Sequence, residues 1–198
     1  DENTGTSAKD SSGNNYNSST FTGAGWRGGK YGSGLYFDGN DSVVRVTEGS
    51  AFDLGATTDS YTVEAWINTT TNFTTNNGGI VSKRAATGIY PMYLYVDLNN
   101  QQACFGISDG TFAPAICSTG AINDGLWHHV GGVRDVGSDL LRVYLDGIQK
   151  DTTADTTTAT TANDLDLAIG NSGTSYTEND FTGSIDDVRV YSYARTQK

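Results

Sequence analysis

Basic residues and long apolar runs are both scarce in this chain of 198 residues. Lys and Arg number 12 against 23 Asp and Glu, which gives a formal net charge of −11. This balance disfavours binding to nucleic acid, because phosphate-binding surfaces need clustered cations. No apolar stretch reaches the roughly 18 residues of a membrane-spanning helix, so we expect no membrane insertion. An acidic surface rich in Thr, Ser and Asn is typical of a secreted or cell-surface protein.

Residues that favour long helices are also under-represented. Ala, Glu, Lys, Leu and Arg are too few for a coiled coil, and 25 glycines are spread along the whole chain. Aromatic residues make up 11% of the sequence, whereas disordered chains are poor in them. The length suits one domain of the larger all-β kind. We expect residues 1–9 to be a polar extension or linker, and residues 10–198 to be a single domain of a larger multidomain protein.

Apolar and polar residues alternate with a period of two in many short segments, which predicts β-strands. In residues 61–68, for example, Tyr61 and Val63 alternate with Thr62 and Glu64. Such segments follow one another at intervals of about 10 to 20 residues without helical patterns between them, which favours an antiparallel β-sandwich of two sheets. The predicted strands are 35–37, 44–46, 61–68, 78–83, 92–97, 126–134, 140–146, 164–169 and 183–191. The Thr-rich stretch 151–161 is predicted to be a sheet edge or a surface loop.

The two cysteines, Cys104 and Cys117, flank a segment that contains the turn residues Gly110 and Pro114. If residues 104–108 and 115–118 are the two arms of a hairpin, the thiols lie opposite each other and can form a disulfide. A bridge that closes about 14 residues stabilises a fold by about 3 kcal/mol in the chain-entropy model. The alternative is two buried free thiols that act as small apolar side chains.

Seven short strings stand out along the chain. They are Gly34-Leu-Tyr-Phe-Asp-Gly39 with Val43-Val-Arg-Val46, Tyr61-Thr-Val-Glu-Ala-Trp-Ile67, Gly79-Ile-Val-Ser-Lys83, Trp127-His-His-Val130, Val143-Tyr-Leu-Asp-Gly147 and Phe181-Thr-Gly-Ser-Ile-Asp-Asp-Val-Arg-Val-Tyr191. In order and spacing they resemble the bacterial laminin-G-like jelly rolls of the concanavalin A-like lectin and glucanase superfamily. The resemblance runs from about residue 10 to 193 and implies a jelly roll, a fold that serves many functions.

The sequence contains no obvious catalytic pair. Glucanases with this jelly roll carry paired glutamates in a Glu-x-Asp-x-x-Glu arrangement, which is absent here. The glutamates are isolated from one another, at Glu2, Glu48, Glu64 and Glu178. Glycoside hydrolysis needs two carboxyl groups roughly 5 to 10 Å apart, so Glu64, on the same strand face as Trp66, is at most a lone acid. His128 and His129 are adjacent on a predicted strand and face opposite sides, which favours structural roles. We therefore predict a domain that is not an enzyme.

A calcium site is predicted near the start of the domain. The segment 10–15, with the sequence DSSGNN, gathers carboxylate and amide oxygens around a glycine turn, and oxygen is the ligand that Ca²⁺ prefers. The resemblance implies that the first and last strands lie side by side and that a structural Ca²⁺ ties the termini together. The implied ligands are Asp10, Asn14, Tyr16, Asp186 and Asp187. The alternative is that Asp10 starts an Asx-turn and that Asp186 pairs with Arg189 or Arg45.

Carbohydrate recognition in such folds uses aromatic rings that stack on sugar rings, together with polar groups that bind the hydroxyls. Here Tyr93, Tyr95 and Asp97 share one strand face, and Arg142 and Tyr144 share another. If these faces line the concave sheet, they form a binding platform. Its rim is then completed by aromatic residues in predicted loops: Tyr90, Phe112 and Tyr176. The alternative is that the tyrosines only cover strand surfaces.

The sequence therefore favours a non-catalytic, extracellular module that binds a glycan or polysaccharide and is stabilised by Ca²⁺. One alternative is a protein-interaction or adhesion domain of a cell-surface protein, with no sugar site. A less favoured alternative is a glycoside hydrolase or polysaccharide lyase.

Overall fold

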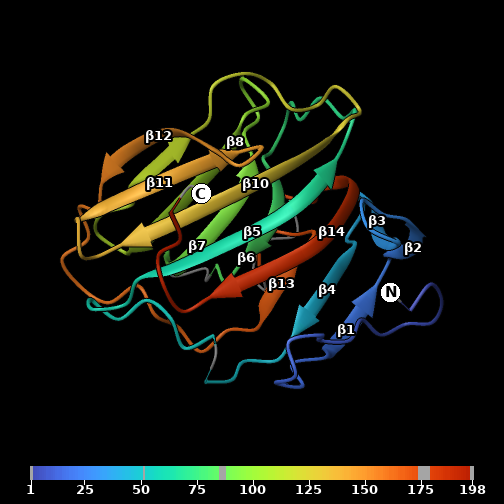
Figure 1. Cartoon of the computed structure of the whole chain (residues 1–198), viewed down its shortest axis with the longest axis horizontal. Coiled ribbons are helices and arrows are strands. Elements are labelled where there is room, and N and C mark those ends of the chain that lie inside the picture. Colours follow the sequence, from blue (N-terminus) through green and yellow to red (C-terminus); the bar gives the residue numbers. More distant parts are fainter. Residues whose placement is uncertain (1, 51, 85–87, 174–178, 197–198) are drawn as a thin grey trace.

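A computed structural model describes residues 2–50, 52–84, 88–173 and 179–196. Within these ranges, 14 strands form two seven-stranded antiparallel sheets. The order in sheet A is β1 (Ser18–Thr22), β4 (Val43–Val46), β13 (Leu167–Ile169), β6 (Gly78–Ser82), β7 (Ile89–Val96), β8 (Ala103–Asp109) and β9 (Ala115–Cys117). The order in sheet B is β12 (Ile148–Ala154), β11 (Leu140–Leu145), β10 (Trp127–Asp135), β5 (Tyr61–Asn68), β14 (Thr182–Tyr191), β3 (Ser33–Asp38) and β2 (Gly25–Gly28). The two sheets pack as a sandwich (Figure 1), which confirms the predicted all-β jelly roll. The described part of the chain has no helix with the length and apolar character needed to cross a membrane.

The hydrophobic core lies between the two sheets and follows the period-two pattern of the sequence. On β5 the alternate residues from Tyr61 to Ile67 are fully buried, and on β7 the alternate residues from Met92 to Val96 are buried in the same way. Because successive side chains of a strand point to opposite faces, the residues between them belong to the outer faces of the sandwich. The core pattern therefore determines which side chains are available for binding.

The predicted strands correspond to β3, β4, β5, β6, β7, β10, β11, β13 and β14, and the predicted hairpin arms to β8 and β9. The Thr-rich stretch divides, since residues 151–154 belong to β12 at the edge of sheet B and the residues after them form a loop. The sequence pattern does not predict β1 and β2, whose sequences are SSTFT and GWRG. Both are edge strands, and they bury too few side chains to show an apolar alternation.

Residues 2–9 lie against the edge strands of both sheets. The backbone N–H of Ser18 in β1 donates to the carbonyl of Ala8 at 2.8 Å. The indole Nε1 of Trp26 in β2 donates to the carbonyl of Gly5 at 3.0 Å. Ala8 also packs against the core. This polar segment therefore makes specific contacts with the sandwich.

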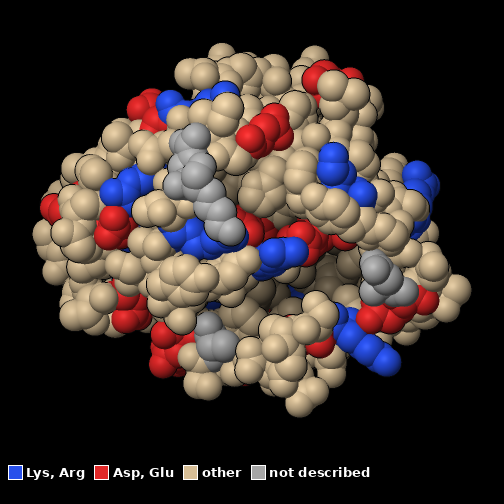
Figure 2. All heavy atoms as spheres, in the orientation of Figure 1, with Lys and Arg blue, Asp and Glu red and all other residues tan. Residues whose placement is uncertain are grey.

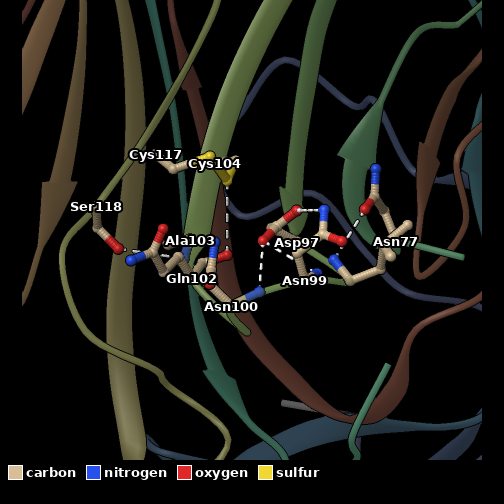
Figure 3. Close-up of a disulfide and its surroundings, with 10 residues drawn as sticks. Asn77, Asp97, Asn99, Asn100, Gln102, Ala103, Cys104, Cys117 and Ser118 are labelled. Atoms are coloured by element: carbon tan, nitrogen blue, oxygen red, sulfur yellow. Dashed lines mark hydrogen bonds between the residues drawn. A yellow bond between two sulfur atoms is a disulfide. The ribbon is translucent and has the colours of Figure 1, made fainter. Parts of the chain in front are cut away.

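A disulfide joins β8 and β9 at one edge of sheet A. Cys104 lies opposite Cys117 in the strand register, and their Cα atoms are 4.0 Å apart (Figure 3). The predicted bridge is thus confirmed. It closes the β8–β9 hairpin and restricts the unfolded chain, a stabilisation of about 3 kcal/mol for a loop of this size.

Candidate functional site

The outer face of sheet B carries polar and aromatic side chains where four strands meet. On β5, Glu64 and Trp66 alternate with the core residues. Glu64 lies opposite Gly131 of β10 and Arg189 of β14, and Trp66 lies opposite His129 of β10. The strand register therefore gathers a carboxylate, an indole, an imidazole and a guanidinium on one surface.

A hollow forms on this face because Gly131 has no side chain. Its cross-strand neighbours are Glu64 and Tyr144 of β11, and a Cβ atom at Gly131 would lie 3.6 and 3.8 Å from their Cβ atoms. The hollow, called here the sheet B pocket, has a volume of about 560 Å³. Figure 2 shows a hollowed surface on this side of the molecule, with charged side chains of both signs around it. The pocket is lined by Tyr31, Thr62, Glu64, Trp66, His129, Gly131, Val133, Tyr144, Asp146, Gly147, Asp187, Arg189, Arg195 and Thr196.

A β-bulge in β14 contributes an ion pair to this pocket. The register with β5 shifts between Asp186 and Arg189, and Asp187 within the bulge has a φ of 49°. Asp tolerates this left-handed conformation better than most residues, and bulges commonly redirect a side chain. The Asp187 carboxylate accepts a hydrogen bond from Arg189 Nε at 2.9 Å, and Arg189 Nη2 forms an ion pair with its other oxygen at 2.8 Å. Both side chains thereby line the pocket.

The chain after β14 turns back over the outer face of sheet B (Figure 1) and forms a wall of the pocket. The hydroxyl of Thr62 donates to the carbonyl of Tyr193 and accepts from the backbone N–H of Arg195, both at 2.9 Å. Arg195 Nη1 then reaches Glu64 Oε1 at 2.6 Å. The hydroxyl of Tyr191 donates to the same oxygen at 3.3 Å. The buried Glu64 carboxylate is therefore balanced by a guanidinium that comes from the C-terminal segment.

Aromatic rings surround Trp66 at the other side of the pocket. The ring of Tyr31, which is 55% exposed, meets Trp66 edge-on with centroids 5.9 Å apart. The imidazole of His129 approaches the same indole at 5.2 Å, and Lys30 Nζ lies 4.2 Å from its ring centroid. This group offers both apolar ring surface and a cation.

His129 is an uncharged hydrogen-bonding group at neutral pH. Burial lowers the pKa of His129 below its ordinary value of 6.5, although the carboxylate of Glu64, 3.9 Å from Nε2, acts in the opposite direction. A neutral imidazole offers one donor and one acceptor. The pocket thus combines a buried ion pair with a neutral polar group.

The structure divides the residues predicted for a sugar platform between two opposite faces. Tyr93 and Tyr95 lie on the outer face of sheet A, because Met92 and Leu94 of the same strand face the core. Their rings stack at 4.3 Å, and the guanidinium of Arg84 lies 4.6 Å from the Tyr93 ring. Tyr93 is only 4% exposed, and burial raises the pKa of both phenols. Tyr93 therefore presents little free surface to a ligand, whereas Tyr95 is partly exposed.

The other predicted residues on this side have local partners or lie apart. Tyr90 meets Tyr93 edge-on at 6.4 Å. The Asp97 carboxylate accepts from the backbone N–H groups of Asn99 and Asn100 and so closes the β7–β8 turn (Figure 3). Phe112 is exposed in the β8–β9 loop. Tyr176 lies outside the described residues.

Two predicted residues lie on the outer face of sheet B. Tyr144 lines the sheet B pocket. Arg142 donates to Asp135 at 2.7 Å and to Ser138 at 2.8 Å, and it is not part of the pocket lining. Of the predicted platform residues that the structure describes, only Tyr144 therefore lines the pocket.

The predicted calcium ligands lie near two different sheets. Asp10 precedes β1 of sheet A, and its carboxylate accepts from Ser12 N at 2.8 Å, Ser12 Oγ at 2.7 Å and Tyr16 N at 3.1 Å. These contacts match the alternative to a calcium ligand, in which Asp10 starts an Asx-turn. Asp186 lies on β14 of sheet B, and its Oδ2 accepts from Tyr31 N at 2.8 Å. The last strand, β14, pairs with β3, which is the first strand that the sequence predicts. The loop that contains Asp10, however, precedes β1, and β1 pairs with β4 in the other sheet.

These placements do not fit a shared cation site. Asn14 donates to Ser12 Oγ at 3.0 Å, and Asp187 is held by Arg189. Across residues 2–50, 52–84, 88–173 and 179–196, no group of three His, Cys, Asp or Glu side chains is arranged to hold a metal ion. The calcium site stays a prediction from the resemblance.

Chelation tests the calcium prediction. A bound Ca²⁺ would make excess EDTA lower the melting temperature, because a ligand that binds only the folded state raises it. Asp10→Ala would remove this response if Asp10 is a ligand. A melting temperature that EDTA leaves unchanged would reject a stabilising calcium site.

A second hollow lies at the loop edge, beside the β3–β4 turn and the loop after β5. Its volume is about 630 Å³, and it is lined by Gly39, Asn40, Asp41, Thr71, Asn72, Phe73, Thr74, Thr75, Asn76 and Asp180. Burial and the charges of Asp41 and Asp38 raise the pKa of the Asp180 carboxyl. The one aromatic ring in this lining, Phe73, is buried. The sheet B pocket, in contrast, presents exposed ring surface.

Solved structures with a similar fold include domains of binding proteins. The binding domain of Paraclostridial Mosquitocidal Protein 1 has a TM-score of 0.77 and 15% identity over 96% of this chain and 47% of its own. The Botulinum Neurotoxin serotype G binding domain has a TM-score of 0.76 and 11% identity, and the match covers 96% of this chain and 46% of the neurotoxin domain. The chain thus spans about half the length of these two. A third similar structure is Domain 4 of AbnA, a GH43 extracellular arabinanase from Geobacillus stearothermophilus, in complex with arabinotriose. It has a TM-score of 0.67 and 19% identity, and the match covers 88% of this chain and 77% of the arabinanase domain.

Family membership is shown by a match over most of the sequence. No curated protein matches the chain. The family model Laminin_G_3, described as concanavalin A-like lectin/glucanases superfamily, matches residues 38–198. That range includes the strands that build the sheet B pocket, from β5 to β14. The chain therefore belongs to the Laminin_G_3 family of the concanavalin A-like lectin/glucanases superfamily.

Proposed function

We propose that this domain is a non-catalytic carbohydrate-binding module and that the sheet B pocket is its binding site. The observation that carries the proposal is the position of Trp66 and Tyr31 beside the hydrogen-bonding groups of Glu64 and Arg195 in a hollow of about 560 Å³. Sugar rings have apolar faces that pack on aromatic rings and hydroxyls that need paired polar groups. The pocket offers both within one surface.

The partners of Glu64 favour binding over catalysis. Glycosidases use two carboxyl groups, of which one is a general acid with a raised pKa. Glu64 instead accepts hydrogen bonds from Arg195 and Tyr191, and Nε2 of His129 lies 3.9 Å from the same carboxylate oxygen. A carboxylate that already accepts hydrogen bonds from a guanidinium and a hydroxyl is placed to hold a ligand by further polar contacts, and among the residues that the structure describes no second carboxylate is paired with it as glycoside hydrolysis requires.

The relatives support the class of function. The arabinanase domain is described in a complex with arabinotriose, and the two toxin domains are described as binding domains. An extracellular location is supported by the Cys104–Cys117 disulfide, because such bridges persist in oxidising compartments. Carbohydrate binding and an extracellular location are therefore both parts of the proposal for this chain.

Removing the aromatic wall or filling the pocket is expected to weaken binding. Against a panel of soluble polysaccharides that includes arabinan, galactan and xylan, Trp66→Ala should lower the affinity for the bound polysaccharide about five-fold or more, since an aromatic contact is commonly worth about 1 kcal/mol. Gly131→Leu should have a similar effect, because its side chain would occupy the hollow between Glu64 and Tyr144. Affinity electrophoresis or calorimetry measures both.

The control is Phe112→Ala, which removes an exposed ring from the β8–β9 loop, away from the pocket lining. It should leave the affinity unchanged. Loss of binding in Phe112→Ala with normal binding in Trp66→Ala would place the binding site at the β8–β9 loop. Absence of binding to the whole panel would reject the proposal and favour a protein partner.

A further inference from the structure

We infer that the sheet B pocket selects saccharides that carry a carboxylate, and that Arg195 is the residue that binds this carboxylate. The inference deepens the proposed function and rests on it. It assigns a ligand class to the pocket and a specificity-determining role to a residue outside the strands.

The first observation is that three cations lie at the pocket in a chain with a net charge of −11, beside the carboxylates of its lining. Lys30 lies over the ring of Trp66, and Arg189 and Arg195 line the hollow together with Glu64, Asp146 and Asp187. Figure 2 shows blue side chains at the margin of the hollowed surface. At physiological salt, charges interact strongly only within about 8 Å, so a ligand in the pocket responds to the donors and charges that it contacts directly more than to the net charge of the protein.

The second observation is the bonding of Arg195. A guanidinium has five N–H donors in a planar fork. Nη1 donates to Glu64, and the guanidinium carbon lies 4.6 Å from the ring centroid of Tyr191. Nε and Nη2 donate to no residue among those that the structure describes. These donors belong to a partly exposed side chain that lines the pocket.

The third observation is that Arg195 is held in position before any ligand arrives. Its backbone N–H donates to Thr62 at 2.9 Å, and Glu64 fixes its guanidinium at 2.6 Å. A guanidinium that is already oriented loses little side-chain freedom when a ligand binds. Carboxylates match its fork with two parallel hydrogen bonds, which a sugar hydroxyl cannot provide. The sugar ring of the same residue would then lie toward Trp66 and Tyr31.

The test compares saccharides that differ only in charge. The first pair is a galacturonic acid trimer and its methyl ester, and the second pair is sialyllactose and its methyl ester, so that the two pairs distinguish uronates from sialic acids. In calorimetry at 150 mM NaCl we expect the acidic member of one pair to bind at least about ten-fold more tightly than its neutral partner, as for a charge-assisted contact. The preference should shrink as the salt concentration rises.

Substitutions connect this preference to Arg195. Arg195→Gln should remove the difference between the acidic and neutral members, and Arg195→Lys should retain part of it, because it keeps the charge without the planar fork. The matched control is Arg142→Gln on the same face, whose guanidinium is bound by Asp135 and Ser138 outside the pocket. It should leave the preference unchanged.

The outcomes separate this inference from the proposed function. Equal binding of acidic and neutral partners, or a preference that survives Arg195→Gln, would overturn the inference while the carbohydrate-binding function stands. Binding of neither pair, and of none of the polysaccharides named above, would reject both. A melting curve of each variant shows whether the fold is retained, and Arg195→Lys gives a second reading if Arg195→Gln is unstable.

Discussion

Arg134→Ala is expected to lower the free energy of unfolding by about 3–5 kcal/mol, which is typical when one partner of a buried ion pair is removed. Arg134 Nε donates to Asp155 Oδ2 at 2.7 Å, and the two side chains are 3% and 4% exposed. Nη1 also donates to the carbonyl of Ala56 at 2.9 Å, and Nη2 to the hydroxyl of Thr157 at 3.2 Å. Without the guanidinium, the Asp155 carboxylate would remain buried without a counter-charge. Urea denaturation measures the loss.

A more exposed ion pair on the same sheet provides the control. Arg142 Nη1 also lies 2.7 Å from a carboxylate, that of Asp135, but the side chains are 16% and 23% exposed. Water can solvate the remaining carboxylate, so Arg142→Ala should cost only about 1 kcal/mol or less. Equal losses in Arg134→Ala and Arg142→Ala would show that burial does not set the strength of these pairs.

Gly132→Val is expected to destabilise the fold by more than about 3 kcal/mol, because overpacking of a dense core forces side chains and backbone to move. A Cβ atom at Gly132 would lie 2.2 Å from two ring atoms of Phe105, which is fully buried in sheet A. Valine adds two further methyl groups to this contact between the sheets. Thermal or urea denaturation, read by circular dichroism, would show the loss.

The adjacent glycine gives a matched comparison. Gly131 lies on the same strand but faces outward, and a Cβ atom there would meet its nearest neighbours at an ordinary 3.6 Å. Gly131→Val should change the stability by less than about 1 kcal/mol, since Val suits a strand and has room. If Gly132→Val were as stable as Gly131→Val, the two sheets would not be in close contact at Phe105.

The fold could be predicted from sequence where side chains alternate strictly. Residues from Tyr61 to Ile67 and from Met92 to Val96 show the period of two because one face of each strand is buried and the other is not. The disulfide could be predicted for a related reason, since the turn residues between Cys104 and Cys117 imply a hairpin that places them opposite each other. Both are local patterns.

The site could be predicted only in part, because it depends on which strands are neighbours. The alternation places Tyr95 and Tyr144 on outer faces, but it does not show that β7 and β11 belong to different sheets. The shared face of Glu64 and Trp66 was visible in the sequence, whereas the meeting of Glu64 with Arg195 follows from a reversal of the chain after β14. No local pattern indicated that reversal.

The course of the C-terminal segment matters for the preparation of the protein. Arg195 and Thr196 line the pocket, and the segment after β14 crosses the outer face of sheet B in Figure 1, whereas residues 2–9 lie beside the edge strands β1 and β2. An affinity tag fused shortly after Thr196 would start next to the sheet B pocket and compete with a ligand for it. Recombinant samples for binding measurements should therefore carry their tag at the N-terminus.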